Sequence, residues 1–270
     1  MNRKLGINTD CFSGELDEVS TLTLAHDIGF EAITTSATFI GDVQRLKNVA
    51  DSLGVDLSYI HSPFANINSL WIAGDDFRTV YNGIIESIDS ASACDIESVI
   101  VHVSSGWQAP PVNDLGISRF DSLVEYAADR NVTLAFENLR KLGNLAYLID
   151  RYEHMQNVRF CYDCGHEHCY TKTVSWIDIF TDKIVATHIH DNPGRGFDDK
   201  VSDNDRHWLP FDGTFNYHTM MERLDKYGYS GPLMLEVFKK AKSDYQALSA
   251  EEFLSTAFER IKRISQLNNI

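Results

Sequence analysis

The chain has 270 residues, 43% of them hydrophobic, and carries 39 acidic against 24 basic side chains, a formal charge of −15. This acidic surplus disfavours duplex nucleic acid as a partner, because binding to a phosphate backbone depends on basic side chains that displace counterions. No apolar run approaches the roughly eighteen residues of a membrane span, and residues 1–10 reach an Asp before any signal-peptide core develops, so we expect a soluble, cytoplasmic protein.

The six Pro and sixteen Gly residues are scattered along the chain, and no low-complexity tract or Ser/Gly linker marks a boundary. The hydrophobic content is sufficient for a substantial core. We therefore predict one domain covering residues 1–270.

Apolar runs rich in Val, Ile and Phe alternate with longer segments of helical periodicity, as expected for a parallel sheet. The predicted strands are 4–9, 30–35, 55–60, 98–104, 132–137, 158–163, 184–190 and 232–237. The predicted helices are 17–28, 41–53, 75–94, 114–130, 144–155, 173–181, 214–227 and 249–267. Eight such units in a chain of this length favour an α/β fold with a single closed (β/α)₈ TIM barrel. An open doubly wound sheet is the rival, but residues 10–15 after the first strand lack its Gly-rich phosphate loop.

Metal-ligating side chains follow the predicted strands where each strand ends. Segment 158–168 begins as a buried strand and then presents Asp163 and His166, with Gly165 between them expected to let the chain turn. Five other strand ends carry His or Glu, and the loop after the seventh strand adds two more ligand types; these residues are His61, His102, Glu137, His188, Glu236, Asp205 and His207. A single such residue is usually a hydrogen-bonded rim residue. A ring of them, with Glu137 and Glu236 facing a barrel mouth, predicts a bound cation, because a buried unpaired carboxylate is costly.

The five cysteines suggest a competing metal site. Their odd number and the crowding of Cys161, Cys164 and Cys169 argue against a disulfide framework. Cys161, Cys164, His166 and His168 would offer a tetrahedral zinc site, but if Asp163 and Cys161 point into the barrel, Cys164 faces the other way. We therefore favour thiols that act as small buried hydrophobic groups.

The ordered set of strand-end residues resembles the xylose isomerase-like TIM barrel superfamily, which includes sugar phosphate isomerases and epimerases and endonuclease IV-type apurinic endonucleases. The resemblance covers nearly the whole chain. It is carried by residues 61–64 (HSPF), 137–138 (EN), 163–166 (DCGH), 188–192 (HIHDN), 205–207 (DRH) and 235–236 (LE).

The resemblance implies a ligand set. The single metal of the epimerase branch would be held by Glu137, Asp163, His188 and Glu236. The endonuclease branch, with three metals, adds ligands that fall on His61, His102, His166, Asp205 and His207. All nine positions carry ligand-competent residues, so one to three divalent ions are expected, with Mn, Zn, Co, Fe and Mg as the candidates.

The leading functional prediction is a metal-dependent isomerase or epimerase of a small sugar, polyol or sugar phosphate that acts through an enediolate. Glu137 and Glu236 would exchange protons with the substrate, and His166 would orient its oxygens. The expected substrate-binding residues are Arg195 and Arg206, for a carboxylate or phosphate, and Phe12, Trp107 and Trp208, for apolar walls.

Three alternatives stay open: a multinuclear phosphodiesterase, a dehydratase or lyase, and a non-catalytic sugar- or metal-binding subunit. The endonuclease reading is weakened because Phe64 stands where that class has Tyr, and because the loop after the first strand lacks Lys and Arg. A second copy of the chain is a candidate partner, since barrels of this kind often borrow a rim residue from a neighbouring subunit.

Overall fold

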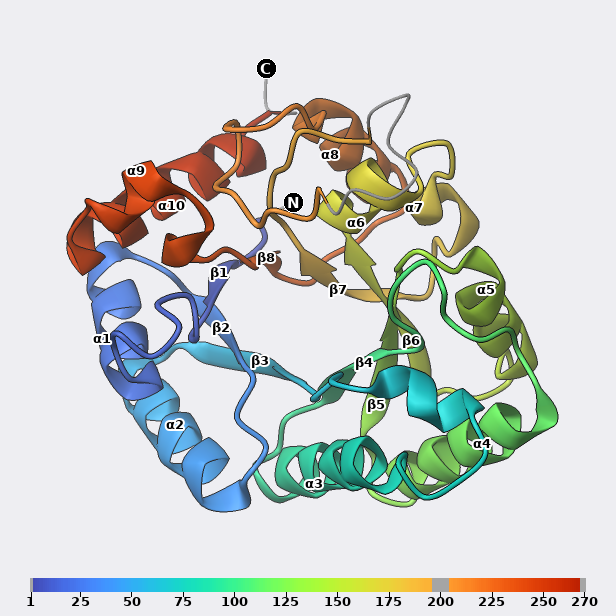
Figure 1. Ribbon diagram of the computed structural model, residues 1–270. Helices are drawn as coiled ribbons and strands as arrows, with labels where there is room; N and C mark the ends of the chain where they lie inside the picture. The colour runs from blue at the N-terminus through green and yellow to red at the C-terminus, as the bar shows by residue number, and fades with distance from the viewer. Residues whose placement is uncertain (1, 196–203, 268–270) are drawn as a thin grey trace.

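Eight parallel strands form the centre of the molecule. In the computed structural model, which describes residues 2–195 and 204–267, each strand pairs with its neighbour in the order β7-β6-β5-β4-β3-β2-β1-β8. Just beyond β7, Ile189 bridges to Leu235 of β8 and closes the ring (Figure 1). The strands are β1 (Leu5–Asn8), β2 (Ala32–Thr35), β3 (Asp56–His61), β4 (Ser98–His102), β5 (Thr133–Glu137), β6 (Val158–Asp163), β7 (Ile184–His188) and β8 (Leu233–Leu235). The predicted (β/α)₈ barrel is confirmed.

Helices surround the strands on the outside (Figure 1). They are α1 (Glu18–Ile28), α2 (Ile40–Leu53), α3 (Arg78–Ala93), α4 (Asp114–Ala128), α5 (Leu142–Arg151), α6 (Cys164–Tyr170), α7 (Trp176–Ile179), α8 (Tyr217–Lys226), α9 (Ser243–Gln246) and α10 (Ala250–Ser265), with short 3₁₀ turns η1 (Ile67–Trp71) and η2 (Lys239–Ala241). Each predicted helix overlaps an observed one, although 173–181 shrinks to the single turn of α7. Helix α6 was not predicted, because it follows β6 without any intervening loop.

The helices pack through apolar stripes. Helix α10 begins with a capping box, in which the side chains of Ser249 and Glu252 each accept the other's backbone N–H. Its apolar stripe is buried at Phe253, Leu254, Ala257, Ile261 and Ile264. Among the described residues, no helix is long and apolar enough to cross a membrane.

The barrel interior is a second, smaller core of mostly small side chains. It contains Ala32, Tyr59, Ile100, Ala135, Cys161, Ala186 and Met234. Cys161 therefore points inward, whereas Cys164 packs in the outer core between the strands and the helices. Strand parity was correct on this point, because alternate residues of a strand face opposite sides of the sheet.

The strand register brings ligand-type residues side by side at the carboxyl ends. His102 of β4 pairs with Glu137 of β5, and Asp163 of β6 pairs with His188 of β7. Because the strands are parallel, their ends meet at one mouth of the barrel. The fold therefore places these four side chains at a common site.

Two helix glycines, one in a tight contact and one in open space, provide a matched test of helix packing. A Cβ at Gly116 would lie 1.9 Å from the ring of Trp71, whose Nε1 donates to Val103 O at 2.7 Å and so fixes the ring. Gly116→Ala should lower the free energy of unfolding by about 1–3 kcal/mol through overpacking. A Cβ at Gly143 of α5 would contact nothing within 4 Å, so Gly143→Ala should be neutral or stabilise by roughly 0.5–1 kcal/mol. Urea unfolding of both variants measures the difference, and equal stabilities would contradict it.

Candidate metal centre

The end of β6 is held in place by hydrogen bonds from Asn138 and Asp163, which also position candidate ligands. Asn138 Nδ2 donates to Asp163 O, and Asp163 N donates to Asn138 Oδ1, each at 2.8 Å. Asp163 is also the N-cap of α6, and its Oδ1 accepts from His166 N at 2.6 Å. The spacing between Asp163 and His166 is therefore that of a helix cap. Gly165 was expected to let the chain turn. The structure shows a different reason for a glycine here, because a Cβ would lie 2.0 Å from His190 Cε1.

An inner group of four ligands lies at the base of the mouth. Glu137, Asp163, His188 and Glu236 each offer a ligand atom, and these atoms lie within 4.8 Å of one another. His188 Nδ1 is 3.2 Å from Glu137 Oε1, 3.5 Å from Glu236 Oε2 and 3.9 Å from Asp163 Oδ2. These residues come from, or directly follow, β5, β6, β7 and β8, so the closure of the barrel brings them together.

A second group shares Glu137 with the first. Glu137 Oε2 lies 3.0 Å from His102 Nε2 and 3.5 Å from His61 Nε2. The three residues satisfy the same 4.8 Å criterion, as do His61, His188 and Glu236. Glu137 is therefore the carboxylate around which the inner part of the cluster is arranged.

An outer group contains one residue that the sequence analysis did not assign. His166, His190, Asp205 and His207 form a further set of four. His190 Nε2 lies 3.2 Å from Asp163 Oδ1 and 3.7 Å from Asp205 Oδ1, and its ring stacks on that of His207 with centroids 4.0 Å apart. The available signal was the spacing from His188, since residues two apart along an extended chain face the same side.

Three imidazoles are oriented by backbone carbonyls. The Nδ1 atoms lie 2.9 Å from Ser62 O for His61, 3.0 Å from Asn138 O for His166 and 2.9 Å from Glu236 O for His207. Because a carbonyl only accepts, Nδ1 donates to it in each ring, and Nε2 is the atom that faces the cluster and could bind an ion once it is deprotonated. Metal-ligating histidines are held in the same way.

The charge balance of the cluster also suits a cation. Burial raises the pKa of Glu137, but the facing His102 and His188 outweigh it and hold the pKa well below the usual range. Burial lowers the pKa of His207, whereas Asp205 raises it, with a net result of about 10. Glu137 thus stays ionised, and Asp205 favours a proton on His207. A divalent ion would satisfy the same negative charge and release that proton.

The partners of the three inner carboxylates support this fit. Within residues 2–195 and 204–267, the ion pairs of Glu137, Asp163 and Glu236 are all to histidines, with no Lys or Arg among them. Imidazole and carboxylate together are the donors that Mn, Zn, Co and Fe accept. The residues present therefore fit a divalent metal.

The cysteine-based alternative is not supported. None of the metal-competent groups found among the described residues includes a cysteine. Cys161 lies inside the barrel, and Cys164 Sγ donates to His190 O at 3.3 Å on the other side of the strand.

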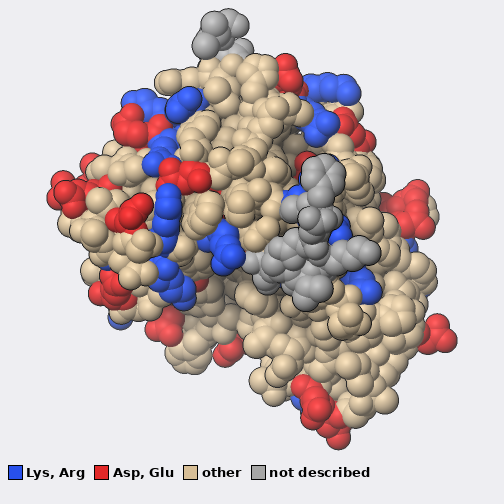
Figure 2. All heavy atoms as spheres, turned by 45° about the horizontal axis from the view of Figure 1, so that its top comes forward, with Lys and Arg blue, Asp and Glu red and all other residues tan. Residues whose placement is uncertain are grey.

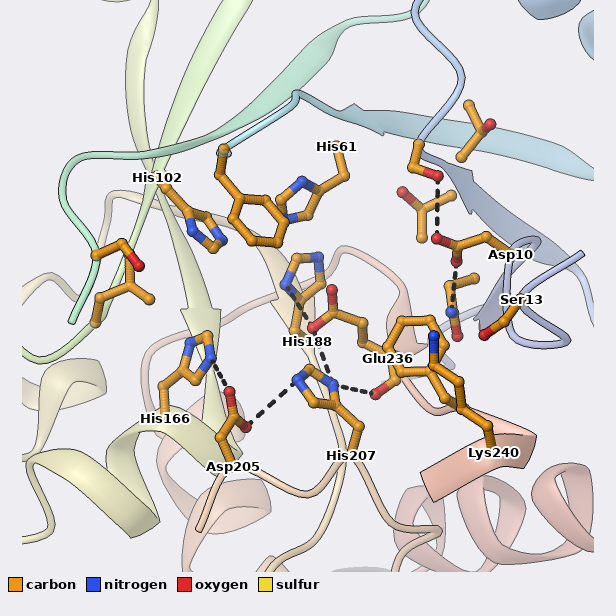
Figure 3. A pocket seen from close by; sticks show the side chains of 18 of the residues that line it. Asp10, Ser13, His61, His102, His166, His188, Asp205, His207, Glu236 and Lys240 are labelled. Carbon is orange, nitrogen blue, oxygen red and sulfur yellow. Dashed lines mark hydrogen bonds and ion pairs between the residues drawn. The ribbon is translucent and has the colours of Figure 1, made fainter. Parts of the chain in front are cut away.

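A pocket of about 720 Å³ opens above the cluster. His61, His102, His166, His188, Asp205, His207 and Glu236 line it, together with residues from the ends of β1 and β2 (Figure 3). Glu236 reaches the pocket wall with 15% of its side chain exposed, whereas Glu137 is completely buried and is not part of the lining. The volume falls in the range of small-molecule sites.

The five expected substrate-binding residues do not line this pocket. Phe12 is buried against Phe253 in the outer core. Trp208 Nε1 donates to Ala241 O at 3.3 Å. The other three are Trp107, which packs edge-on against Tyr170; Arg195, which donates to Tyr170 O; and Arg206, which is exposed. The lining aromatics are instead Phe238 and Phe64, and Phe64 stacks on His102 with centroids 4.3 Å apart.

Comparison with protein families identifies the fold family. A model described as "Xylose isomerase-like TIM barrel" matches residues 22–261. The chain belongs to the xylose isomerase-like TIM barrel family.

Three individual proteins are similar to this chain to different extents. The uncharacterized protein y4fM of Sinorhizobium fredii is 32% identical over 158 residues, 52% of this chain and 48% of that protein. The inosose isomerase of Halalkalibacterium halodurans is 34% identical over 104 residues, 37% of this chain and 34% of that protein. These matches span only about half and about a third of the two relatives. The crystal structure of a D-tagatose 3-epimerase-like protein matches with a TM-score of 0.74 at 18% identity and covers 98% of each chain.

Metal content provides a direct test of the cluster. Purified protein should contain about one or more equivalents of divalent metal, and removal by a chelator should lower the melting temperature, because an ion that binds only the folded state stabilises it. Glu137→Gln should lower the metal content, since Glu137 belongs to two groups. Glu259→Gln on the exposed face of α10 is the control. Elemental analysis that finds less than about half an equivalent in the unmodified protein would contradict the site.

Proposed function

We propose that the protein is a divalent-metal-dependent isomerase or epimerase of a small sugar or polyol. The observation that carries the proposal is the convergence of Glu137, Asp163, His188 and Glu236 within 4.8 Å beneath a pocket of about 720 Å³. This combination pairs a metal-competent carboxylate and imidazole set with space for a molecule the size of a monosaccharide.

The comparisons support the same reaction class. One curated relative is an inosose isomerase, and a matching structure is that of a D-tagatose 3-epimerase-like protein. Both names describe rearrangement of a polyhydroxylated carbonyl compound. The transfer of that chemistry to this chain is our proposal, since the first match is partial and the second is low in identity.

A bound divalent ion would supply Lewis acidity that favours removal of a proton next to a carbonyl group. The protein must then provide a base that reaches the substrate. Glu236 is suited to this role by its position, because it lines the pocket with 15% of its side chain exposed and can therefore reach a bound substrate.

Glu137 and His166 would have complementary roles. Glu137 lies beneath the histidines, so we propose that it holds the ion, and that any proton it returns to the substrate must pass between these rings. His166 lines the pocket, so we propose that its Nε2 orients a substrate oxygen that replaces the contact with Asp205 Oδ2 at 3.0 Å. An enediolate formed after proton removal would lie between these groups and Glu236.

Replacing the base tests this assignment. Glu236→Gln should lower kcat by about 10²–10⁴-fold, because general base catalysis contributes this much. Melting temperature and metal content should be measured together with turnover, since Glu236 is also a candidate ligand. Full activity in this variant would remove Glu236 from the mechanism. Loss of turnover in proportion to loss of metal would contradict its role as the base and assign it to the ligands.

A multinuclear phosphodiesterase is the second candidate function. The observation in its favour is the presence of ligand groups beyond the inner four, namely the one formed by His61, His102 and Glu137 and the outer one formed by His166, His190, Asp205 and His207. A hydroxide between two ions could attack a phosphodiester. A dehydratase or lyase would use the same ligands, and product analysis would distinguish it.

Abasic duplex DNA separates the two leading candidates. On the face shown in Figure 2, acidic and basic side chains are interspersed, and the chain has a formal charge of −15. We therefore expect no nicking of abasic duplex DNA by the metal-loaded protein at low salt, where electrostatic binding is strongest. A gel assay with and without chelator measures this, and efficient metal-dependent nicking would favour the phosphodiesterase.

A further inference from the structure

The side of the pocket formed by β1 and β2 is made of short oxygen-bearing side chains. They are Asn8, Asp10, Ser13, Thr34, Thr35 and Ser36, which we call the β1–β2 wall. Figure 3 shows His102 and His166 on one side of the pocket and Asp10 and Ser13 on the other, with Glu236 between them. The β1–β2 wall therefore faces the part of a ligand that extends away from the outer histidines.

Asp10 is held in place by two neutral donors. Asn8 Oδ1 accepts from Val237 N at 3.0 Å, which leaves Asn8 Nδ2 to donate to Asp10 Oδ1 at 2.7 Å. The backbone N–H fixes the orientation of the Asn8 amide, because only its oxygen can accept. Ser36 Oγ donates to Asp10 Oδ2 at 3.0 Å. The carboxylate is therefore oriented on both oxygens and is coupled through Asn8 to the residue that follows Glu236.

The other hydroxyl groups of the β1–β2 wall have also committed their protons. Thr34 Oγ1 donates to Tyr59 O at 3.0 Å, and Thr35 Oγ1 donates to Glu18. Of the described hydroxyls in this wall, only that of Ser13 keeps a proton without a fixed acceptor. Apart from this hydroxyl and the second N–H of the Asn8 amide, the wall offers acceptors to a ligand.

No cation neutralises Asp10 within the part of the chain that the structure describes. It forms no ion pair there, and a carboxylate with about four acceptor positions has only two of them occupied. Of the cationic residues of the pocket, Arg140 follows β5 and stacks on Tyr170, whereas the exposed Lys240 of η2 lies on the same side as Asp10 (Figure 3) but forms no ion pair with it. A phosphate or carboxylate brought to Asp10 would meet like charge and further acceptors.

We propose that Asp10 determines substrate specificity by accepting hydroxyl groups of an uncharged polyol or sugar and by rejecting a phosphate or carboxylate at that end of the molecule. The inference rests on the proposed function, since it concerns the same pocket. It narrows the substrate class from sugars and sugar phosphates to unphosphorylated, hydroxyl-rich compounds. Asp10 acts as a binding residue, with Asn8 and Ser36 as its positioning residues.

Binding of unreactive polyols tests the inference without turnover. The probes are sorbitol with sorbitol 6-phosphate and myo-inositol with myo-inositol 1-phosphate, titrated calorimetrically into the metal-loaded protein. In at least one pair, the neutral polyol should bind at least about tenfold more tightly than its phosphate. Asp10→Asn should weaken binding of that polyol by about tenfold, because the variant loses a charged hydrogen bond. In the same variant, the dissociation constants of the polyol and its phosphate should differ by less than in the unmodified protein.

Two further variants control for changes in fold and net charge. Ser36→Ala should weaken binding of the polyol by roughly threefold, because it removes one donor that orients Asp10. Asp27→Asn removes the same charge at the far end of α1, where the side chain is 68% exposed, and should leave the dissociation constants unchanged. Melting temperatures of all variants establish that they are folded.

The outcomes separate this inference from the proposed function. Failure of both neutral polyols to bind, tighter binding of both phosphates, or an unchanged dissociation constant in Asp10→Asn would overturn the role of Asp10. Isomerase and epimerase turnover is measured separately with ketoses and inososes. Selective polyol binding without turnover would overturn the proposed function and leave the inference standing.

Discussion

The burial of two carboxylates at the barrel mouth is the constraint on which the rest of the site depends. Glu137 and Asp163 are completely excluded from solvent, and an ionised group in that position costs several kcal/mol unless it is paired. The surrounding strands supply imidazoles, each of which can carry a proton or leave a lone pair for a metal. The cluster is therefore stable as an arrangement only if it holds positive charge, whether as protons or as an ion.

Side-chain amides keep this arrangement in register where the strand ladder ends. Asn138, next to Glu137, links β5 to the end of β6, and Asn8 links the end of β1 to Val237, next to Glu236. Asp163 serves both as a helix cap and as a candidate ligand. Local folding and ligand placement thus depend on the same atoms, which pre-organises the site.

The sequence predicted what depends on burial and strand direction. The strands are apolar because both of their faces are covered, and their parallel direction brings His102, Glu137, Asp163 and His188 to one end. It did not predict His190 as part of the outer group. It also did not predict the β1–β2 wall, because short polar residues after a strand look the same in a pocket and in an ordinary loop. Large aromatic residues in the rim loops were weak indicators of substrate-binding positions, since Phe12 packs in the outer core.

The two sides of the pocket come from different parts of the barrel, so the proposed reaction chemistry and the proposed substrate choice depend on different strands. The candidate ligands lie on β3 to β8 and the loop after β7, whereas Asp10 and its neighbours follow β1 and β2. Among the residues that the structure describes, the Asp10 carboxylate bonds only to Asn8 and Ser36, so changes at Asp10 or Ser36 should leave Glu137 and His188 in place. A barrel built in this way can keep one proton-transfer chemistry while the opposite wall selects which hydroxylated molecule is brought to it.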